Sequence, residues 1–230
     1  MSLVQAQQEP VIKMAVLLGS HFYLASILDK NEFRKKIKIL CLQNQKQLAK
    51  QSTLICKKIL ASPQFQNAQE IFAYMALPDE VDLSEVIKQA LQDGKKVALP
   101  KIISKTDGIM QFFYLDSQKA LAQQTSNGAY GILEPDENMP ATLDTTHKTL
   151  ILVPGRAFTK DGDRLGRGKG YYDRYLAKGL GMGPFESLRD HGHHLRNHEN
   201  VIIAGVCFDF QILDTIPTAE NDICMNTVFF

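Results

Sequence analysis

A long helical pattern of apolar residues runs over residues 30–61. Phe33, Ile37 and Leu40 recur at intervals of three and four residues, and the same spacing resumes further along the chain. This periodicity places apolar side chains on one face of an α-helix. Because Pro63 cannot continue the hydrogen bonding of a helix, the pattern predicts one long helix that ends just before it.

Beyond this helix, short apolar runs alternate with further helical patterns. The run at 70–76 is followed by a helical segment at 82–91, which Asp82 and Glu85 are expected to cap, and by another apolar run at 96–100. A strand, a helix and a strand in this order build parallel sheets, so the sequence predicts an α/β fold with a mostly parallel central sheet. Further strands are expected at 110–115, 149–153, 201–207 and 226–230, and a further helix at 169–178.

The composition agrees with a globular fold. The chain has 230 residues, of which 44% are hydrophobic and 22% charged, and this excludes collagen-like, coiled-coil and disordered classes. Lys and Arg number 26 and Asp and Glu 25, which gives a net charge of +1. The chain is therefore not basic enough overall to coat nucleic acid or membranes. Its length fits a single domain.

The sequence predicts a cytoplasmic protein. Its four cysteines form no Cys-x-x-Cys pair, which argues against a disulfide framework or a cysteine zinc site and favours a reducing compartment. The longest uncharged run, residues 14–28, is shorter than the about 20 apolar residues that a membrane-spanning helix needs. No small-residue cleavage site follows it, so a secretory signal is not predicted.

Positive charge is concentrated in the first predicted helix. Between residues 30 and 58, nine Lys and Arg residues accompany a single acid, Glu32. For most of them we interpret this charge as a solvated helix face. The alternative is a surface that binds RNA or a nucleotide, in which the tyrosines between residues 171 and 175 would stack on bases.

A second unusual segment, residues 179–200, is rich in glycine and histidine. His191, His193, His194 and His198 invite a zinc interpretation, because imidazoles are common zinc ligands. No cysteine or carboxylate cluster joins them at the spacing of a zinc site, and we therefore interpret the segment as a solvated loop.

The segment that is most informative about chemistry is glycine-rich and spans residues 162–170. It follows an apolar run, alternates glycines with basic residues, and leads into the aromatic start of a helix. Glycines let backbone N–H groups approach an anion closely, and a helix N-terminus adds unpaired N–H groups. The glycine-rich segment therefore predicts a binding loop for a polyphosphate. Its glycines are Gly162, Gly166, Gly168 and Gly170, and its basic residues, with Lys160 just before it, are Arg164, Arg167 and Lys169.

This loop matches neither of two well-known nucleotide motifs. Lys169 is followed by Gly170 instead of Ser or Thr, which excludes a Walker A loop, and the glycine spacing does not fit a Rossmann fingerprint. Asp173 lies within one helical turn of the loop. There it could hold Mg²⁺ against phosphate oxygens or serve as an ordinary first-turn acid, and the pattern leaves both interpretations open.

A longer signature runs through the same segment and resembles that of the 5-formyltetrahydrofolate cyclo-ligase family, also called methenyltetrahydrofolate synthetases. The resemblance covers residues 30–228 and leaves 1–29 unmatched. The signature comprises Gly162, Arg164, Leu165, Gly166, Gly168, Lys169, Gly170, Tyr171, Tyr172, Asp173 and Arg174. Further matching residues lie at Lys30 and Arg34 and within 74–82, 94–100, 131–135, 154–158 and 211–222.

The resemblance implies a single catalytic domain, residues 30–230, after an N-terminal extension, residues 1–29, of unknown role; Met14 is an alternative start. The implied fold is a three-layer α/β/α sandwich related to the sugar-phosphate isomerase and CoA-transferase architecture. The implied activity is the ATP- and Mg²⁺-dependent cyclisation of 5-formyltetrahydrofolate to 5,10-methenyltetrahydrofolate, with release of ADP and phosphate.

The resemblance also implies roles for individual residues. Asp173 and Asp222 resemble the Mg²⁺ ligands, and Met75 and Glu80 resemble positions that line the folate. On pattern alone, a solvated loop acid is the simpler interpretation of Glu80, and a strand-core side chain that of Met75. The expected ATP contacts are Lys30, Arg34, Arg164, Gly166, Arg167, Gly168, Lys169, Gly170, Tyr171 and Tyr172. Of these, Arg167, Lys169 and Tyr171 are also the expected catalytic and folate-contacting residues.

Three positions depart from the pattern of the family. Arg156 and Thr159 stand where an aliphatic and an acidic residue are expected, and Asn226 stands where an acid is common. These changes concern the electrostatics of loops and leave the class of reaction intact. We expect a monomer with 5-formyltetrahydrofolate and ATP as substrates and without membrane or nucleic-acid partners. The alternative is a non-enzymatic nucleotide- or RNA-binding module that uses the basic helix and the glycine-rich segment.

Overall fold

The computed structural model describes residues 29–137, 139–143, 146–181 and 199–230. Residues 1–28, with Met14, and the four histidines between 191 and 198 lie outside the described residues. Among the helices that the structure describes, none has the length and apolar character to cross a membrane.

A sheet of seven strands lies at the centre of the fold. Its strands are β1 (Glu70–Phe72), β2 (Lys96–Ser104), β3 (Ile109–Tyr114), β6 (Pro140–Ala141), β7 (Thr149–Pro154), β10 (Val201–Val206) and β11 (Thr227–Phe229). They are ordered β11-β10-β7-β1-β2-β3-β6. The pairs from β11 to β2 are parallel, and the β2–β3 and β3–β6 pairs are antiparallel. The predicted α/β fold with a mostly parallel sheet is confirmed.

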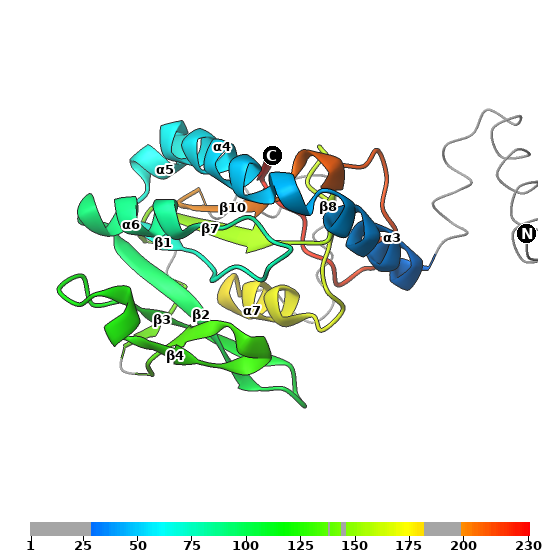
Figure 1. The fold of residues 1–230 in the computed structure, drawn as a ribbon. Helices are drawn as coiled ribbons and strands as arrows, with labels where there is room; N and C mark the ends of the chain where they lie inside the picture. The colour runs from blue at the N-terminus through cyan, green and yellow to red at the C-terminus, as the bar shows by residue number, and fades with distance from the viewer. Residues whose placement is uncertain (1–28, 138, 144–145, 182–198) are drawn as a thin grey trace, which may run out of the picture.

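Helices cover both faces of this sheet (Figure 1). α4 (Leu48–Ala61), α5 (Pro63–Asn67) and α6 (Ser84–Gln92) pack on one face, and α7 (Tyr171–Gly179) packs on the other. Because consecutive strand residues point to opposite faces, Ile71 packs beneath α4, α5 and α6, whereas Phe72 packs in the cluster of α7. The three layers agree with the implied sandwich. Its relation to the sugar-phosphate isomerase and CoA-transferase architecture stays a prediction.

The prediction of one long helix over residues 30–61 is wrong. The structure has two helices, α3 (Lys30–Gln43) and α4, separated by a short 3₁₀ turn. The backbone N–H and the side-chain amide of Asn44 both donate to the carbonyl of Leu40, at 3.0 and 2.9 Å. The side-chain amide thus adds a second donor to a carbonyl in the last turn of α3, and Asn44 itself leaves helical geometry, with a φ of −97° and a ψ of 6°. The break frees α3 to pack through Ile37 beside the glycine-rich segment, away from the sheet.

Two predicted boundaries near the site also shift. The strand predicted over 70–76 pairs only as far as Phe72, after which the chain leaves the sheet. At the start of α6, Asp82 accepts hydrogen bonds from the backbone N–H and the hydroxyl of Ser84, at 2.9 and 2.6 Å, in place of the capping box predicted with Glu85. Both changes make the connection between β1 and α6 a structured turn that borders the site.

Candidate active site

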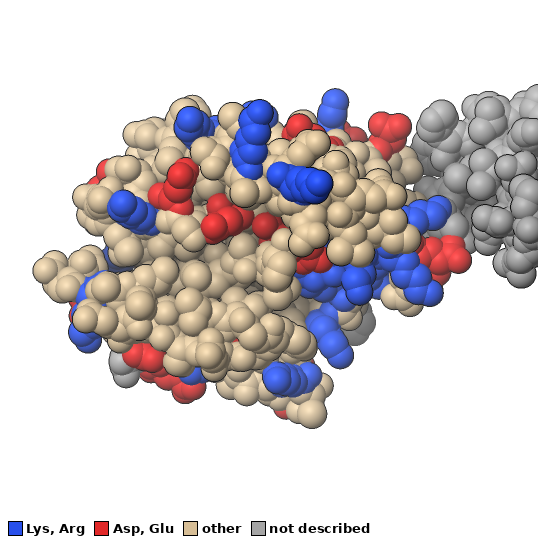
Figure 2. Space-filling model, viewed as in Figure 1, with Lys and Arg blue, Asp and Glu red and all other residues tan. Residues whose placement is uncertain are grey.

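A cavity of about 650 Å³ is lined by residues that follow β1 and residues at the end of β7. In α/β proteins, the carboxyl ends of parallel strands are where ligands bind. In Figure 2, Lys and Arg side chains gather near the start of α3 and of α7. The cavity brings together every site residue expected from the sequence, namely Lys30, Arg34, Met75, Glu80, Arg164, Gly166, Arg167, Gly168, Lys169, Gly170, Tyr171, Tyr172, Asp173 and Asp222.

Hydrogen bonds within the turn between β1 and α6 fix the position of Glu80. The N–H of Glu80 donates to the carbonyl of Leu77 at 2.9 Å, and its carboxylate accepts the Leu77 N–H at 3.0 Å. The hydroxyl of the buried Tyr74 donates to the carbonyl of Val81 at 3.0 Å. With only 7% of its side chain exposed, Glu80 is not the solvated loop acid of the simpler interpretation.

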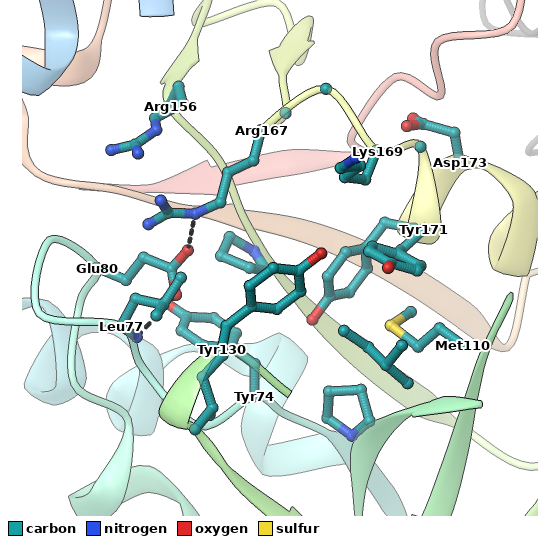
Figure 3. Close-up of a pocket in the computed structure, with 18 of the residues that line it drawn as sticks. Tyr74, Leu77, Glu80, Met110, Tyr130, Arg156, Arg167, Lys169, Tyr171 and Asp173 are labelled. Carbon is teal, nitrogen blue, oxygen red and sulfur yellow. Dashed lines mark hydrogen bonds and ion pairs between the residues drawn. The ribbon is translucent and has the colours of Figure 1, made fainter. Parts of the chain in front are cut away.

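Arg167 of the glycine-rich segment points at this turn (Figure 3). Its Nε lies 2.8 Å from Glu80 Oε1. Its NH2 group donates to Asp79, which also accepts a hydrogen bond from Arg156. Burial acts to raise the pKa of Asp79, but the hydrogen bonds and charges of Arg167 and Arg156 outweigh it and lower this pKa below the ordinary value of 3.8. Asp79 is therefore ionised at neutral pH.

Part of the predicted binding loop is a small hairpin. β8 (Ala157–Phe158) pairs antiparallel with β9 (Arg164–Leu165), so the first half of the glycine-rich segment is tied back to the chain after β7. The Arg164 side chain is 5% exposed and lies 2.7 Å from Asp173 Oδ1. This ion pair joins β9 to the first turn of α7 and fixes the two ends of the glycines between them.

α3 packs against the glycine-rich segment and adds two cations. Arg34 Nε donates to the carbonyl of Gly166 at 2.9 Å, and Lys30 Nζ lies 2.5 Å from Asp222 Oδ2. Gly168 has a φ of 97°, and a Cβ at this position would lie 3.2 Å from the guanidinium carbon of Arg34. Glycine is needed there because other residues would strain the backbone and crowd Arg34.

The two expected metal ligands both line the cavity, and a backbone hydrogen bond connects their segments. Asp173 Oδ1 accepts the backbone N–H of Ile223 at 3.3 Å, and Ile223 directly follows Asp222. Asp222 Oδ2 accepts hydrogen bonds from Lys30 Nζ and from the backbone N–H of Ala219. Among the described residues, no donor reaches the second oxygen of either carboxylate, and no group of three or more His, Cys, Asp or Glu could hold a metal alone.

Lys169 and Tyr171 flank Gly170, whose φ of 64° turns the chain into α7. Arg174 stabilises this turn by donating to the carbonyl of Lys169 and, at 3.0 Å, to a carbonyl of the β2–β3 connection. The Tyr171 hydroxyl is buried and has no partner within the described part of the chain. Burial, with a contribution from neighbouring Tyr130, raises the pKa of Tyr171 to about 12. The hydroxyl therefore keeps its proton at neutral pH and can donate to a ligand.

Apolar and aromatic groups complete the lining. Met75 is half-buried, packs against the core and also lines the cavity. Its position is therefore compatible both with a core side chain and with a side chain that contacts a ligand. Tyr130 crosses the cavity in Figure 3. It is the only described residue other than glycine with a positive φ, 59°. Such a conformation costs a tyrosine energy and recurs at functional sites.

Each of the three departures from the family pattern has a structural partner. Arg156 is paired with Asp79. The buried Thr159 accepts the N–H of Asp163 at 3.0 Å with its hydroxyl. Asn226 accepts the N–H of Ile203 at 2.7 Å and so ties the last strand to β10. Only the first of the three lies in the cavity.

Some residues of the site were not predicted. Arg156, Tyr130 and Glu134 line the cavity and Asp79 lies beside it, but the sequence alone assigns them no function. Asp79 and Arg156 are 77 positions apart, and neither carries a local pattern that predicts their contact. The sequence contains one weak indication of the positive φ of Tyr130, namely the glycine that directly follows it, because glycines are common in turns.

An α/β fold with a cavity at the carboxyl edge of its sheet, lined by cations and by the two expected metal ligands, defines an enzyme that handles an anionic ligand. The family model of the 5-formyltetrahydrofolate cyclo-ligases matches residues 27–230. The chain belongs to this family of ligases, as the signature in the glycine-rich segment implies.

Known relatives resemble the chain over most of its length. The 5-formyltetrahydrofolate cyclo-ligase of Mus musculus is 29% identical over 204 residues, which are 86% of this chain and 90% of the relative. The NMR structure of Aquifex aeolicus 5,10-methenyltetrahydrofolate synthetase superposes with a TM-score of 0.65 at 26% identity, over 86% of this chain and 88% of that one. The Arabidopsis thaliana relative, 24% identical over 95% of this chain and 80% of its own, is named mitochondrial. A cytoplasmic location of this chain thus stays a prediction.

Proposed function

We propose that this chain uses ATP and Mg²⁺ to cyclise 5-formyltetrahydrofolate to 5,10-methenyltetrahydrofolate, with release of ADP and phosphate. The observation that carries the proposal is one cavity that is lined by several Lys and Arg side chains and also by the nearly buried carboxylate of Glu80. A triphosphate requires the cations, and the amino and ring N–H donors of a folate suit the carboxylate. Membership in the cyclo-ligase family supports the same reaction.

The chemical task is to activate a formamide, which is both a poor nucleophile and a poor electrophile. In the proposed sequence, the formyl oxygen attacks the γ-phosphorus of ATP, and the bond from this phosphorus to ADP breaks. N10 of the folate then attacks the carbon of the resulting iminium phosphate. The oxygen leaves with the phosphate, and N10 loses its proton. Alignment and charge neutralisation supply most of such a rate enhancement.

Residues of the glycine-rich segment and of α3 suit the phosphate side. We assign Lys169 and the Tyr171 hydroxyl to the transferring phosphoryl group, because both lie where the segment enters α7. Arg34 and Lys30 of α3 add charge beside the same segment, and the N–H groups at the start of α7 add donors. Arg164 forms an ion pair with Asp173 and so helps to fix the glycine-rich segment against the start of α7.

Asp173 and Asp222 suit a Mg²⁺ ion bound together with phosphate. Both line the cavity, and each retains an oxygen that accepts no hydrogen bond from the described residues. Two carboxylates are too few to bind Mg²⁺ alone, and phosphate oxygens and waters are its usual further ligands. The ion would supply neutralisation of charge on the β- and γ-phosphates.

Glu80, Met75 and Tyr130 suit the folate. In Figure 3, Glu80 lies across the cavity from Asp173, so the folate and the triphosphate can enter from opposite sides and meet between them. The Glu80 carboxylate would accept the pterin N–H donors, while Met75 and the Tyr130 ring offer apolar contact to its faces. The monomer expected from the sequence stays a prediction.

The test is the absorbance of methenyltetrahydrofolate on mixing the protein with ATP, Mg²⁺ and 5-formyltetrahydrofolate. We expect product only when all three are present. Lys169→Ala should lower kcat by about a hundredfold, the usual effect of removing one group that stabilises developing charge. Lys160→Ala is the matched control, because Lys160 is exposed and lies outside the cavity, and it should keep wild-type kcat. Wild-type protein that forms no product would refute the proposal.

A further inference from the structure

Asp79 has no part in the reaction described above, yet it contacts two residues of the cavity. Its Oδ1 accepts a hydrogen bond from Arg167, and its Oδ2 accepts one from Arg156. Both arginines line the cavity, and Asp79 does not belong to the described residues that line it. An effect of Asp79 on a ligand must therefore pass through these arginines.

The contacts fix the orientation of Arg167. Asp79 and Glu80 are consecutive, and they bind neighbouring nitrogens of the guanidinium, NH2 and Nε. A planar guanidinium held along one edge by two carboxylates cannot rotate freely. Its third nitrogen, NH1, makes no hydrogen bond to any described residue. Because Arg167 lines the cavity, the donors of NH1 remain available to an anion that binds there.

Arg156 balances the charge of this arrangement. Asp79 and Glu80 together carry two negative charges, and Arg167 alone would leave the cluster with a net negative charge. With Arg156 bound to Asp79, the cluster of two arginines and two acids is neutral. A neutral cluster does not repel a triphosphate as an acidic one would. An aliphatic residue at this position, as the family pattern favours, would lack this compensation.

We propose that Asp79 is a positioning residue, which orients Arg167 toward the anionic substrate, and that Arg156 is the counter-ion that makes two acids tolerable beside a triphosphate. This inference rests on the proposed function and adds to it two residues with a defined, indirect role. It predicts that most of the effect of Asp79 on catalysis depends on Arg167.

A double-mutant cycle of Asp79→Asn and Arg167→Ala tests the dependence. Asp79→Asn alone should lower kcat/KM for ATP by about tenfold to a hundredfold, the cost of a misplaced catalytic group. In the Arg167→Ala background the additional loss should be much smaller. Asp82→Asn is the matched control, since Asp82 lies in the same turn but binds Ser84, and it should leave kcat/KM unchanged. Independent, additive losses in the double variant would overturn the inference.

Two further measurements complete the test. Arg156→Leu should raise the KM for ATP several-fold with little change in kcat, and an unchanged KM would remove Arg156 from the proposal. The ¹⁵N NMR signal of Arg167 Nε, identified by its absence in Arg167→Ala, should show a rigid side chain in the wild type and a mobile one in Asp79→Asn. This signal does not require turnover. Wild-type protein without product would thus count against the proposed function, and an unchanged signal against the positioning role.

Discussion

Two tyrosine hydroxyls of α7, those of Tyr171 and Tyr175, are buried without a hydrogen-bond partner among the described residues. Tyr171 lines the cavity of the site, whereas the Tyr175 ring packs on Phe112, with ring centroids 4.8 Å apart. A buried hydroxyl without a partner costs free energy of folding. A ligand oxygen in the cavity could accept a hydrogen bond from the Tyr171 hydroxyl but not from that of Tyr175. The two tyrosines therefore allow a direct comparison of a hydroxyl inside the site with one outside it.

Tyr171→Phe removes this donor while keeping the ring. We expect kcat/KM to fall by about tenfold to a hundredfold, because the hydroxyl would donate to charge that develops on the phosphoryl group. Tyr175→Phe, one turn further along the same helix, should keep wild-type kcat/KM and a free energy of unfolding at least as large. Steady-state kinetics and urea unfolding measure the two effects. Equal activity of both variants would exclude Tyr171 from the phosphate site.

The lowered pKa of Asp79 predicts how stability depends on pH. A carboxyl whose pKa is lower in the folded than in the unfolded protein stabilises the fold above its ordinary pKa of 3.8 and loses this effect as the pH falls through the lowered value. The wild type should therefore be more stable than Asp79→Asn at neutral pH. The difference in the free energy of unfolding should shrink as the pH is lowered below 3.8. If the difference in the free energy of unfolding stayed constant in acid, packing or neutral hydrogen bonds, and not the charge of Asp79, would stabilise this turn.

At the scale of elements, the glycine-rich segment depends on α3. Gly168→Ala would strain a positive φ, at a cost of about 1–3 kcal/mol, and would push against Arg34. We expect both a lower free energy of unfolding and a KM for ATP raised about tenfold. Gly94→Ala is the control, because Gly94 has a φ of 73° with nothing within 4 Å of the added Cβ. It should lose stability but keep its KM, and a loss of ATP binding in both variants would contradict the role of Arg34.

Sequence patterns predict some elements well because the forces are local. The parallel strands follow from their apolar runs, and β7 and β10 begin where predicted. The break at Asn44 was missed, since the apolar spacing continues on both sides of it. The β8–β9 hairpin was missed as well. Its strands have two residues each, too few for any periodicity.

The same distinction holds for the site. The resemblance in the glycine-rich segment led to residues that the fold gathers in one cavity, because a phosphate loop is contiguous in the chain. The pairing of Arg167 with Asp79 and Glu80 joins segments 87 and 88 positions apart and needs the sheet order to be known. Sequence alone therefore predicts which residues of this segment line the cavity but not the acids that orient its arginine.

For the whole molecule, the cavity joins α3, the turn after β1, the glycine-rich segment and the chain before β11. A ligand that bridges these segments binds only the folded state. ATP with Mg²⁺ at about a hundred times its Kd should therefore stabilise the fold by about 2.7 kcal/mol. We expect thermal unfolding to show this as a rise in Tm, which AMP at the same concentration should not reproduce. Equal shifts with AMP and ATP would mean that the phosphate side contributes nothing.

The ion pair between Lys30 and Asp222 closes one side of this cavity across 192 positions of the chain. During synthesis, the segment with Lys30 leaves the ribosome long before Asp222 has been translated. The glycine-rich segment and β7 can fold against β1 and β2 in the meantime, but β10, the neighbour of β7, is still missing. A nascent chain therefore holds most of the phosphate-binding residues before it holds a complete cavity. Nucleotide capture should therefore begin only after Asp222 has been translated, and fragments that stop before residue 222 should not hydrolyse ATP.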